Sequence, residues 1–209
     1  MNISEALQFI VAMTIMLNPL GGISVFLDLT KRVSHPEQKK IARSSTIAII
    51  SIMLIALWTG EALLNLLNIT IPAFRFAGGI ILLLIGLSML QSKESAVSHT
   101  EADDEAAKNQ ESIAIVPMAL PVIVGPGAIS TLVIAAGDYP NLIDKVYLTA
   151  ICVLLGICIG LMLYYATRIL NLVGASLIKV ITRIMGMIIM AIAVGMLADG
   201  LLGLLPALR

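Results

Sequence analysis

Long stretches without a charged side chain are the feature that most restricts what this chain can fold into. They cover residues 6–27, 44–60, 62–74, 76–92, 112–137, 146–167 and 184–198. A helix needs about 20 apolar residues to cross the hydrocarbon core of a bilayer. Three of the stretches meet this length alone, and the others reach it if a span accepts one or two charges. The pattern therefore predicts a multi-pass membrane protein.

The composition supports the same class of protein and excludes others. Apolar residues make up 59% of the 209 residues and charged residues 12%, whereas soluble domains have roughly 45–50% and about 25%. The formal charge is zero and only 4% of residues are aromatic. The chain therefore lacks both the positive electrostatic field that attracts nucleic acid and the aromatic side chains on which bases stack. We therefore expect neither a soluble domain, nor a disordered chain, nor a nucleic-acid-binding protein.

Six membrane-spanning helices fit the chain best. Runs such as residues 79–87 do not alternate between polar and apolar residues, as strands of a membrane barrel would, and helices are the other structure that satisfies its own backbone in lipid. The expected fold class is all-α membrane. The spans then have to accept the charges of Glu61, Arg75, Arg183 and Asp199, and Lys179 lies at the start of the last span. The expected spans are residues 6–27, 44–67, 72–91, 112–137, 146–167 and 178–204.

Lysine and arginine predict the orientation of these spans. The loops near 29–43, 92–111 and 168–179 carry nine basic residues, whereas the opposite side has only Lys145 and Arg209. The basic side is cytoplasmic by the positive-inside rule. This predicts a bacterial inner (plasma) membrane protein with both termini in the periplasm. The first span lacks a basic leader and an obvious cleavage site, so we expect it to be retained.

The two halves of the chain resemble each other at an offset of 106–108 residues. Three short segments match in the same order: Ile23-Ser24 with Ile129-Ser130, Leu63–Leu66 with Ile169–Leu172, and Arg75–Gly78 with Arg183–Gly186. Because each half holds three spans, the second half must enter the membrane from the opposite face. The predicted organisation is a three-helix repeat over 1–91, an acidic cytoplasmic linker over 92–111, and an inverted repeat over 112–209.

Two of the spans carry helix-breaking residues near their middle. The first contains Asn18–Gly22 and the fourth contains Pro121–Gly127. Proline lacks an N–H and clashes with the preceding turn, and adjacent glycines permit backbone conformations that unwind a helix. We expect both spans to be broken, with new half-helices beginning near Gly22 and Ala128. Secondary transporters bind substrates between matching broken helices of inverted repeats.

The groups exposed by such breaks suit a zwitterion. A half-helix start offers N–H donors to a carboxylate, and the half-helices that end near Leu17 and Val124 offer carbonyls to an ammonium. The alternative is that the glycines only allow helices to pack closely. The predicted substrate site consists of Asn18, Pro19, Gly21, Gly22, Ser24, Gly125, Pro126, Gly127 and Ser130.

Charged residues inside or beside the spans are candidates for gating or coupling. Arg75 and Arg183 occupy equivalent positions in the two halves and act either as structural pins or as gates. As gates they bind the free carbonyls of the breaks or pair with acidic partners, which are Glu61 and Asp28 judged from depth alone. Glu61 is also a candidate proton-coupling carboxylate, because burial raises the pKa of a carboxyl group; the competing interpretation is an interfacial position near the end of its span.

Other residues have less specific interpretations. Gly156 and Gly160 form a G-x-x-x-G motif, which serves helix packing or a dimer contact. Cys152 and Cys158 are expected on different helix faces, without a disulfide between them. His35 and His99 are expected in loops.

Four motifs resemble those of the MarC family, also described as a neutral amino acid transporter family of six-helix inner-membrane proteins. They are N-P-L-G-G-x-S at 18–24, G-P-G-A-I-S at 125–130, F-R-x-A-G-G at 74–79 and T-R-x-M-G at 182–186. The resemblance covers essentially the whole chain. It implies transport of small neutral amino acids such as glycine and alanine, without a cofactor and with coupling to an ion gradient of protons or sodium.

Other functions fit the sequence less well. An intramembrane enzyme with Ser24 or Ser130 as nucleophile needs a base within reach, and no expected span contains histidine; no H-E-x-x-H motif is present either. A channel or structural subunit, and an exporter of another small metabolite or drug, stay open as alternatives. We expect a secondary transporter with alternating access. The direction of transport and the presence of a homo-oligomer stay undecided by the residues.

Overall fold

The computed structural model describes residues 1–31, 33–91 and 123–205, and these form helices without any strand. The all-α class is therefore confirmed for this part of the chain. The helices are α1 (Ile3–Leu17), α2 (Pro19–Leu29), α3 (His35–Leu66), α4 (Ile71–Gln91), α7 (Pro126–Asp138), α8 (Leu142–Tyr164), α9 (Ala166–Val173) and α10 (Ala175–Leu204).

Five segments of the described chain are long and apolar enough to cross a membrane. They are Ile3–Leu29, His35–Leu66, Ile71–Leu90, Leu142–Tyr164 and Ser176–Leu204, and they correspond to the first, second, third, fifth and sixth expected spans. Of the fourth expected span, α7 covers the last part, and residues 112–122 lie outside the described residues. The six-span count therefore stays a prediction. The linker 92–111 and His99 also lie outside the described residues.

The second span begins about two turns earlier than its hydropathy predicts. The Ser34 and Glu37 side chains form a capping box, which satisfies two of the N–H groups that every helix start leaves without a partner. Pro36 in the first turn favours the same start. His35 therefore begins α3, and its predicted loop position is wrong. Hydropathy locates the apolar part of a helix, whereas the cap fixes where the helix begins.

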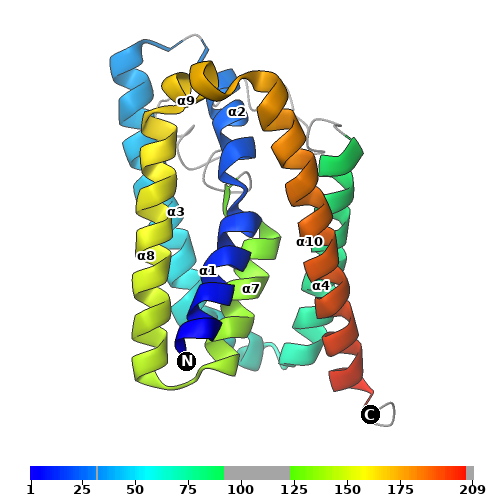
Figure 1. The fold of residues 1–209 in the computed structure, drawn as a ribbon. Helices are drawn as coiled ribbons and strands as arrows, with labels where there is room; N and C mark the ends of the chain where they lie inside the picture. The colour runs from blue at the N-terminus through cyan, green and yellow to red at the C-terminus, as the bar shows by residue number, and fades with distance from the viewer. Residues whose placement is uncertain (32, 92–122, 206–209) are drawn as a thin grey trace.

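The long helices run up and down along one direction, and α9 lies across one end of the bundle (Figure 1). The most extensive packing joins α4 to α10, and α3 packs on both α8 and α7. Helices α4 and α10 approach each other closely at two glycines. A Cβ on Gly86 would lie 2.8 Å from the Gly186 carbonyl oxygen, and one on Gly186 would lie 3.0 Å from that of Gly86.

Helix α8 ends earlier than expected, and its glycines face the interior. The expected fifth span extends to residue 167, but α8 ends at Tyr164 and α9 starts a new direction at Ala166. Gly156 and Gly160 are buried, and a Cβ on either would overlap side chains of α3. This motif therefore packs α8 against α3 and is not a dimer contact. Cys152 is buried and Cys158 is exposed, which confirms that they lie on different faces of α8.

The distribution of apolar side chains is that of a membrane bundle. A continuous core joins the helices through side chains that include Leu17, Phe26, Leu57 and Leu132. Many other large apolar side chains point outward and are exposed, for example those of Ile47, Ile55, Leu84, Leu161 and Val194. Such an outer surface is unfavourable in water but suits lipid tails.

Candidate functional site

The first span is interrupted at a single residue, Asn18. Helix α1 ends at Leu17 and α2 begins at Pro19, because Asn18 has a left-handed backbone with φ of 42°. Asparagine tolerates this conformation, and proline at a first helical position lacks an N–H that would need a partner. The prediction of a break is confirmed. Its extent was wrong, since α2 begins at Pro19 and Gly21 and Gly22 are already helical.

Asn18 caps the new half-helix with its own groups. The Asn18 Oδ1 accepts a hydrogen bond from the Gly21 N–H at 3.3 Å, and the Asn18 carbonyl oxygen accepts one from the Gly22 N–H at 3.0 Å. The Asn18 N–H donates to the Ile15 carbonyl oxygen at 3.1 Å. One asparagine thus satisfies groups at the end of α1 and at the start of α2.

At the second break, as at the first, a half-helix begins at a proline, but the residue before it has a different backbone conformation. Gly125 is extended, with φ of −75° and ψ of 175°, and α7 begins at Pro126. The half-helix therefore begins two residues before the expected Ala128. Ile123 and Val124 precede the break and are buried, and the expected upstream half-helix otherwise lies outside the described residues.

The starts of α2 and α7 lie near the middle of the bundle, and the two helices leave it in opposite directions (Figure 1). Helix α1, which leads into the first break, packs on α7. Each half-helix start carries a positive dipole end. The starts of α2 and α7 therefore place two partial positive charges at the same depth of the bundle.

Two predicted site glycines contact side chains of this chain. A Cβ on Gly21 would overlap the Asn18 carboxamide, and one on Gly127 would overlap the Leu82 side chain of α4. In this conformation both glycines accommodate neighbouring side chains. In this conformation Gly21 and Gly127 therefore fit the alternative interpretation of these motifs, in which the glycines allow close packing.

The serines of the two motifs differ in burial. Ser130 is only 3% exposed and lies against α4, where a Cβ on Gly78 would come 2.9 Å from its Oγ. Ser24 is half-buried. Ser45 of α3 is a residue that the sequence reasoning missed: its Oγ is buried and has no hydrogen-bond partner among the described residues. The polar triplet Ser44-Ser45-Thr46 inside an uncharged stretch was the available signal.

The expected pairing of Arg75 with Glu61 is wrong. The Arg75 Nη2 pairs with the Asp138 carboxylate of α7 at 2.7 Å, and the Arg75 Nη1 lies 3.7 Å from the Asp199 carboxylate of α10. Glu61 instead pairs with Lys145 of α8 at 3.2 Å. The depth of a residue along its span does not show which helix ends are neighbours in the bundle.

The remaining charged candidates lie at the surface. Asp28 pairs with Lys31 one turn away, at 2.7 Å between Oδ1 and Nζ, so its expected role as an interhelical partner is also wrong. Arg183 lies in the first half of α10 and is exposed.

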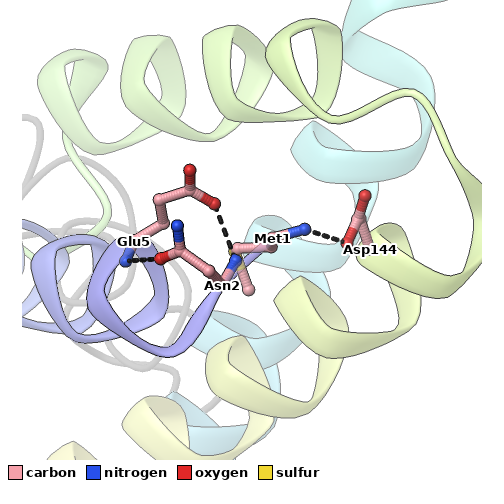
Figure 2. Close-up of polar contacts among 4 residues, drawn as sticks. All are labelled: Met1, Asn2, Glu5 and Asp144. Carbon is pink, nitrogen blue, oxygen red and sulfur yellow. Dashed lines mark hydrogen bonds and ion pairs between the residues drawn. The ribbon is translucent and has the colours of Figure 1, made fainter.

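The start of α1 is held by an ion pair to α8. The Met1 ammonium donates to the Asp144 carboxylate at 2.6 Å (Figure 2). Next to it, the Asn2 and Glu5 side chains bond each other's backbone N–H groups and cap α1. Together with the pairs of Arg75 and Lys145, this contact places interhelical ion pairs at the end of the bundle where α1 begins and α10 ends (Figure 1).

Comparison with known proteins finds similarity along nearly the whole chain. A family model described as MarC family integral membrane protein matches residues 3–205. A UPF0056 membrane protein of Methanocaldococcus jannaschii is 36% identical over 90% of this chain and 92% of its own. UPF0056 membrane protein YhcE of Escherichia coli is 32% identical over 96% and 94%, and one from Buchnera aphidicola subsp. Schizaphis graminum is 33% identical over 97% and 94%. No solved structure matches the chain.

Proposed function

Because the chain belongs to the MarC family of integral membrane proteins, we propose that it is a secondary transporter for small neutral amino acids such as glycine and alanine. The observation that carries the proposal is the pair of half-helices, α2 and α7, that begin near mid-depth and run in opposite directions (Figure 1). Paired half-helix starts in a lipid-embedded bundle are typical of transporter substrate sites.

The substrate carboxylate binds at these half-helix starts, and its ammonium binds carbonyls at the end of α1. The Asn18 carboxamide lies at the start of α2 in this structure. Its hydrogen bond from the Gly21 N–H is 3.3 Å long, beyond the usual range for N–H···O bonds. A carboxylate makes shorter and stronger charge-assisted bonds, so the substrate displaces this carboxamide when it binds.

The packing of the helices supports alternating access by two inverted repeats, 1–91 and 112–209. In that scheme the first span (α1 and α2), α3 and α4 correspond to the fourth, fifth and sixth spans. Two corresponding pairs of helices are in contact, α3 with α8 and α4 with α10, and α1 of the first span also packs on α7 of the fourth. Contacts of this kind are expected around a two-fold axis in the membrane plane. Rocking one repeat against the other then opens the site to one side at a time.

The charged groups act around this site in the proposal. Arg75 gates the periplasmic end, where it bridges α4, α7 and α10 and where α1 begins and α10 ends. Glu61 is the coupling carboxylate for protons or sodium, and its partner Lys145 belongs to the other repeat. Catalysis is not part of the proposal, because Ser24 and Ser130 need a base and the chain's histidines, His35 and His99, lie outside the interrupted helices.

The test is counterflow of labelled glycine or alanine in proteoliposomes. The wild-type protein should accumulate label against preloaded substrate. The double variant Gly127→Leu with Leu82→Ala fills the space at the second break while it removes the side chain that a Cβ there would overlap, and it should fold without counterflow. The matched control is Gly195→Leu, since a Cβ on Gly195 meets nothing within 4 Å. A wild-type protein without counterflow contradicts the substrate class, and a transporting double variant contradicts the site.

A further inference from the structure

Cationic side chains converge on a pair of tyrosines at the end of the bundle opposite the interhelical ion pairs. The Lys39 Nζ lies 5.0 Å from the centroid of the Tyr164 ring, and the Arg43 Cζ lies 5.7 Å from the same centroid. The Arg168 Cζ lies 5.7 Å from the centroid of the Tyr165 ring. The two rings pack edge to face, 5.0 Å apart. Side chains of α3, α8 and α9 thus form one basic–aromatic cluster.

The positive charge of this cluster is not balanced by carboxylates within the described ranges. Asp28 pairs with Lys31 and Glu37 accepts hydrogen bonds from Ser34. No ion pair joins a described carboxylate to Lys39, Arg43 or Arg168. Lys39 and Arg43 are also one helical turn apart, and like charges at this spacing repel each other. An anion between them would relieve this repulsion.

The cluster lies where lipid headgroups would meet the protein. Tyr164 ends one apolar span, and Lys39 and Arg43 directly precede the uncharged stretch of another. Tyrosine, lysine and arginine at the ends of spans are typical of the headgroup level. Helix α9 lies across this end of the bundle (Figure 1). Its Arg168 is exposed and its Leu172 is 86% exposed, which is typical of an amphipathic helix in the interface.

We propose that Lys39, Arg43 and Arg168 form a binding site for the phosphate group of an anionic phospholipid. Arginine and lysine bind phosphate oxygens through charge-assisted hydrogen bonds. The Tyr164 ring holds two of the cations near one point through cation–π contacts, so the site is partly preorganised. A phospholipid fits better than a free anion, because two exposed apolar side chains near Arg168 can contact its acyl chains. Tyr165 has its ring against the Arg168 guanidinium, and Leu172 follows Arg168 by one turn of α9.

The experiment measures the thermal unfolding midpoint of the full chain in detergent with added phosphatidylglycerol, phosphatidylcholine or inorganic phosphate. For the wild type, phosphatidylglycerol should raise the midpoint by about 2–4 °C more than phosphatidylcholine does. Lys39→Gln with Arg43→Gln should abolish this difference. The control Lys31→Gln with Lys40→Gln removes the same charge from exposed positions near the same end and should keep it.

A further pair of variants tests the aromatic ring. Tyr164→Phe keeps the ring and should retain the phosphatidylglycerol effect, whereas Tyr164→Leu removes it and should weaken the effect. Equal loss in both charge-matched double variants would show a general attraction of basic residues to anionic lipid and overturn the site. An equal rise with inorganic phosphate alone would also overturn it, because the occupant would then be a free anion.

Discussion

The side chains of Arg75 and Asp138, 63 residues apart in the chain, are joined by two hydrogen bonds from the Arg75 Nη2, at 3.0 and 2.7 Å. They link α4 to the end of α7, and the Arg75 Nη1 faces Asp199 of α10 at 3.7 Å. Three helices therefore meet at one guanidinium group, and the Arg75 side chain that carries it is 22% exposed. This contact crosses between the two halves of the chain.

Replacing Arg75 by glutamine should destabilise this end of the bundle. Partly exposed ion pairs contribute about 0.2–1 kcal/mol, which corresponds to a fall of about 2–4 °C or less in the unfolding midpoint of a chain of this size. Asp138→Asn should have a similar effect and Asp199→Asn a smaller one, since its distance to Arg75 is longer. Thermal unfolding in detergent measures all three. If Asp199→Asn proves the most destabilising, the assignment of Asp138 as main partner is wrong.

The contact between Gly86 and Gly186 should not tolerate even a methyl group. A Cβ on Gly86 would meet a backbone carbonyl oxygen of α10 at 2.8 Å, which cannot move away as a flexible side chain could. Gly86→Ala should therefore destabilise the protein by about 1–3 kcal/mol, as overpacked positions do. The control is Gly195→Ala, where open space surrounds the new methyl group and alanine's helix propensity should leave stability unchanged or higher. Equal unfolding midpoints for the two variants would contradict this close contact.

The parts of the fold that depend on local chemistry could be predicted from the sequence. The interruption at Asn18 was predicted from Pro19 together with Gly21 and Gly22, because proline disrupts the preceding turn of a helix and adjacent glycines permit an unwound backbone. Its length could not be predicted, because a single left-handed asparagine is enough to let α2 restart at once. The start of α3 at His35 could not be predicted from hydropathy either. The Ser34 cap acts independently of the hydropathy that located the span.

The partners of charged side chains depend on information that a single sequence does not contain. Arg75 pairs with Asp138 because the start of α4 and the end of α7 meet at the same end of the bundle. Glu61 lies at a similar depth, but it faces Lys145 of α8. Similarly, nothing local predicts that Gly127 contacts Leu82. These contacts follow from how helices pack side by side, which periodicity in so apolar a chain does not reveal.

Two exposed asparagines allow a test of the expected orientation. Asn141 precedes α8 at the end with the interhelical ion pairs, and Asn171 lies on α9 at the other end. Each is replaced by cysteine in a Cys152→Ala, Cys158→Ala background. With the basic loops in the cytoplasm, a membrane-impermeant maleimide should label Asn141→Cys in intact cells and Asn171→Cys only after permeabilisation. The reverse labelling would place both termini in the cytoplasm.

Asn18 provides a test that separates its structural role from its proposed role at the substrate site. Asn18→Gly keeps the left-handed backbone without steric cost. Asn18→Ala should lower the free energy of unfolding by about 1–2 kcal/mol more than Asn18→Gly does, because its Cβ disfavours this backbone. Unfolding midpoints should therefore fall more for alanine than for glycine. In counterflow, Asn18→Gly should bind substrate at least as tightly as wild type, because no carboxamide has to leave the start of α2. Asn18→Asp should bind it more weakly, since a fixed carboxylate competes for the same N–H groups. If all three variants transport with wild-type affinity, the start of α2 does not bind the substrate, whatever their stabilities.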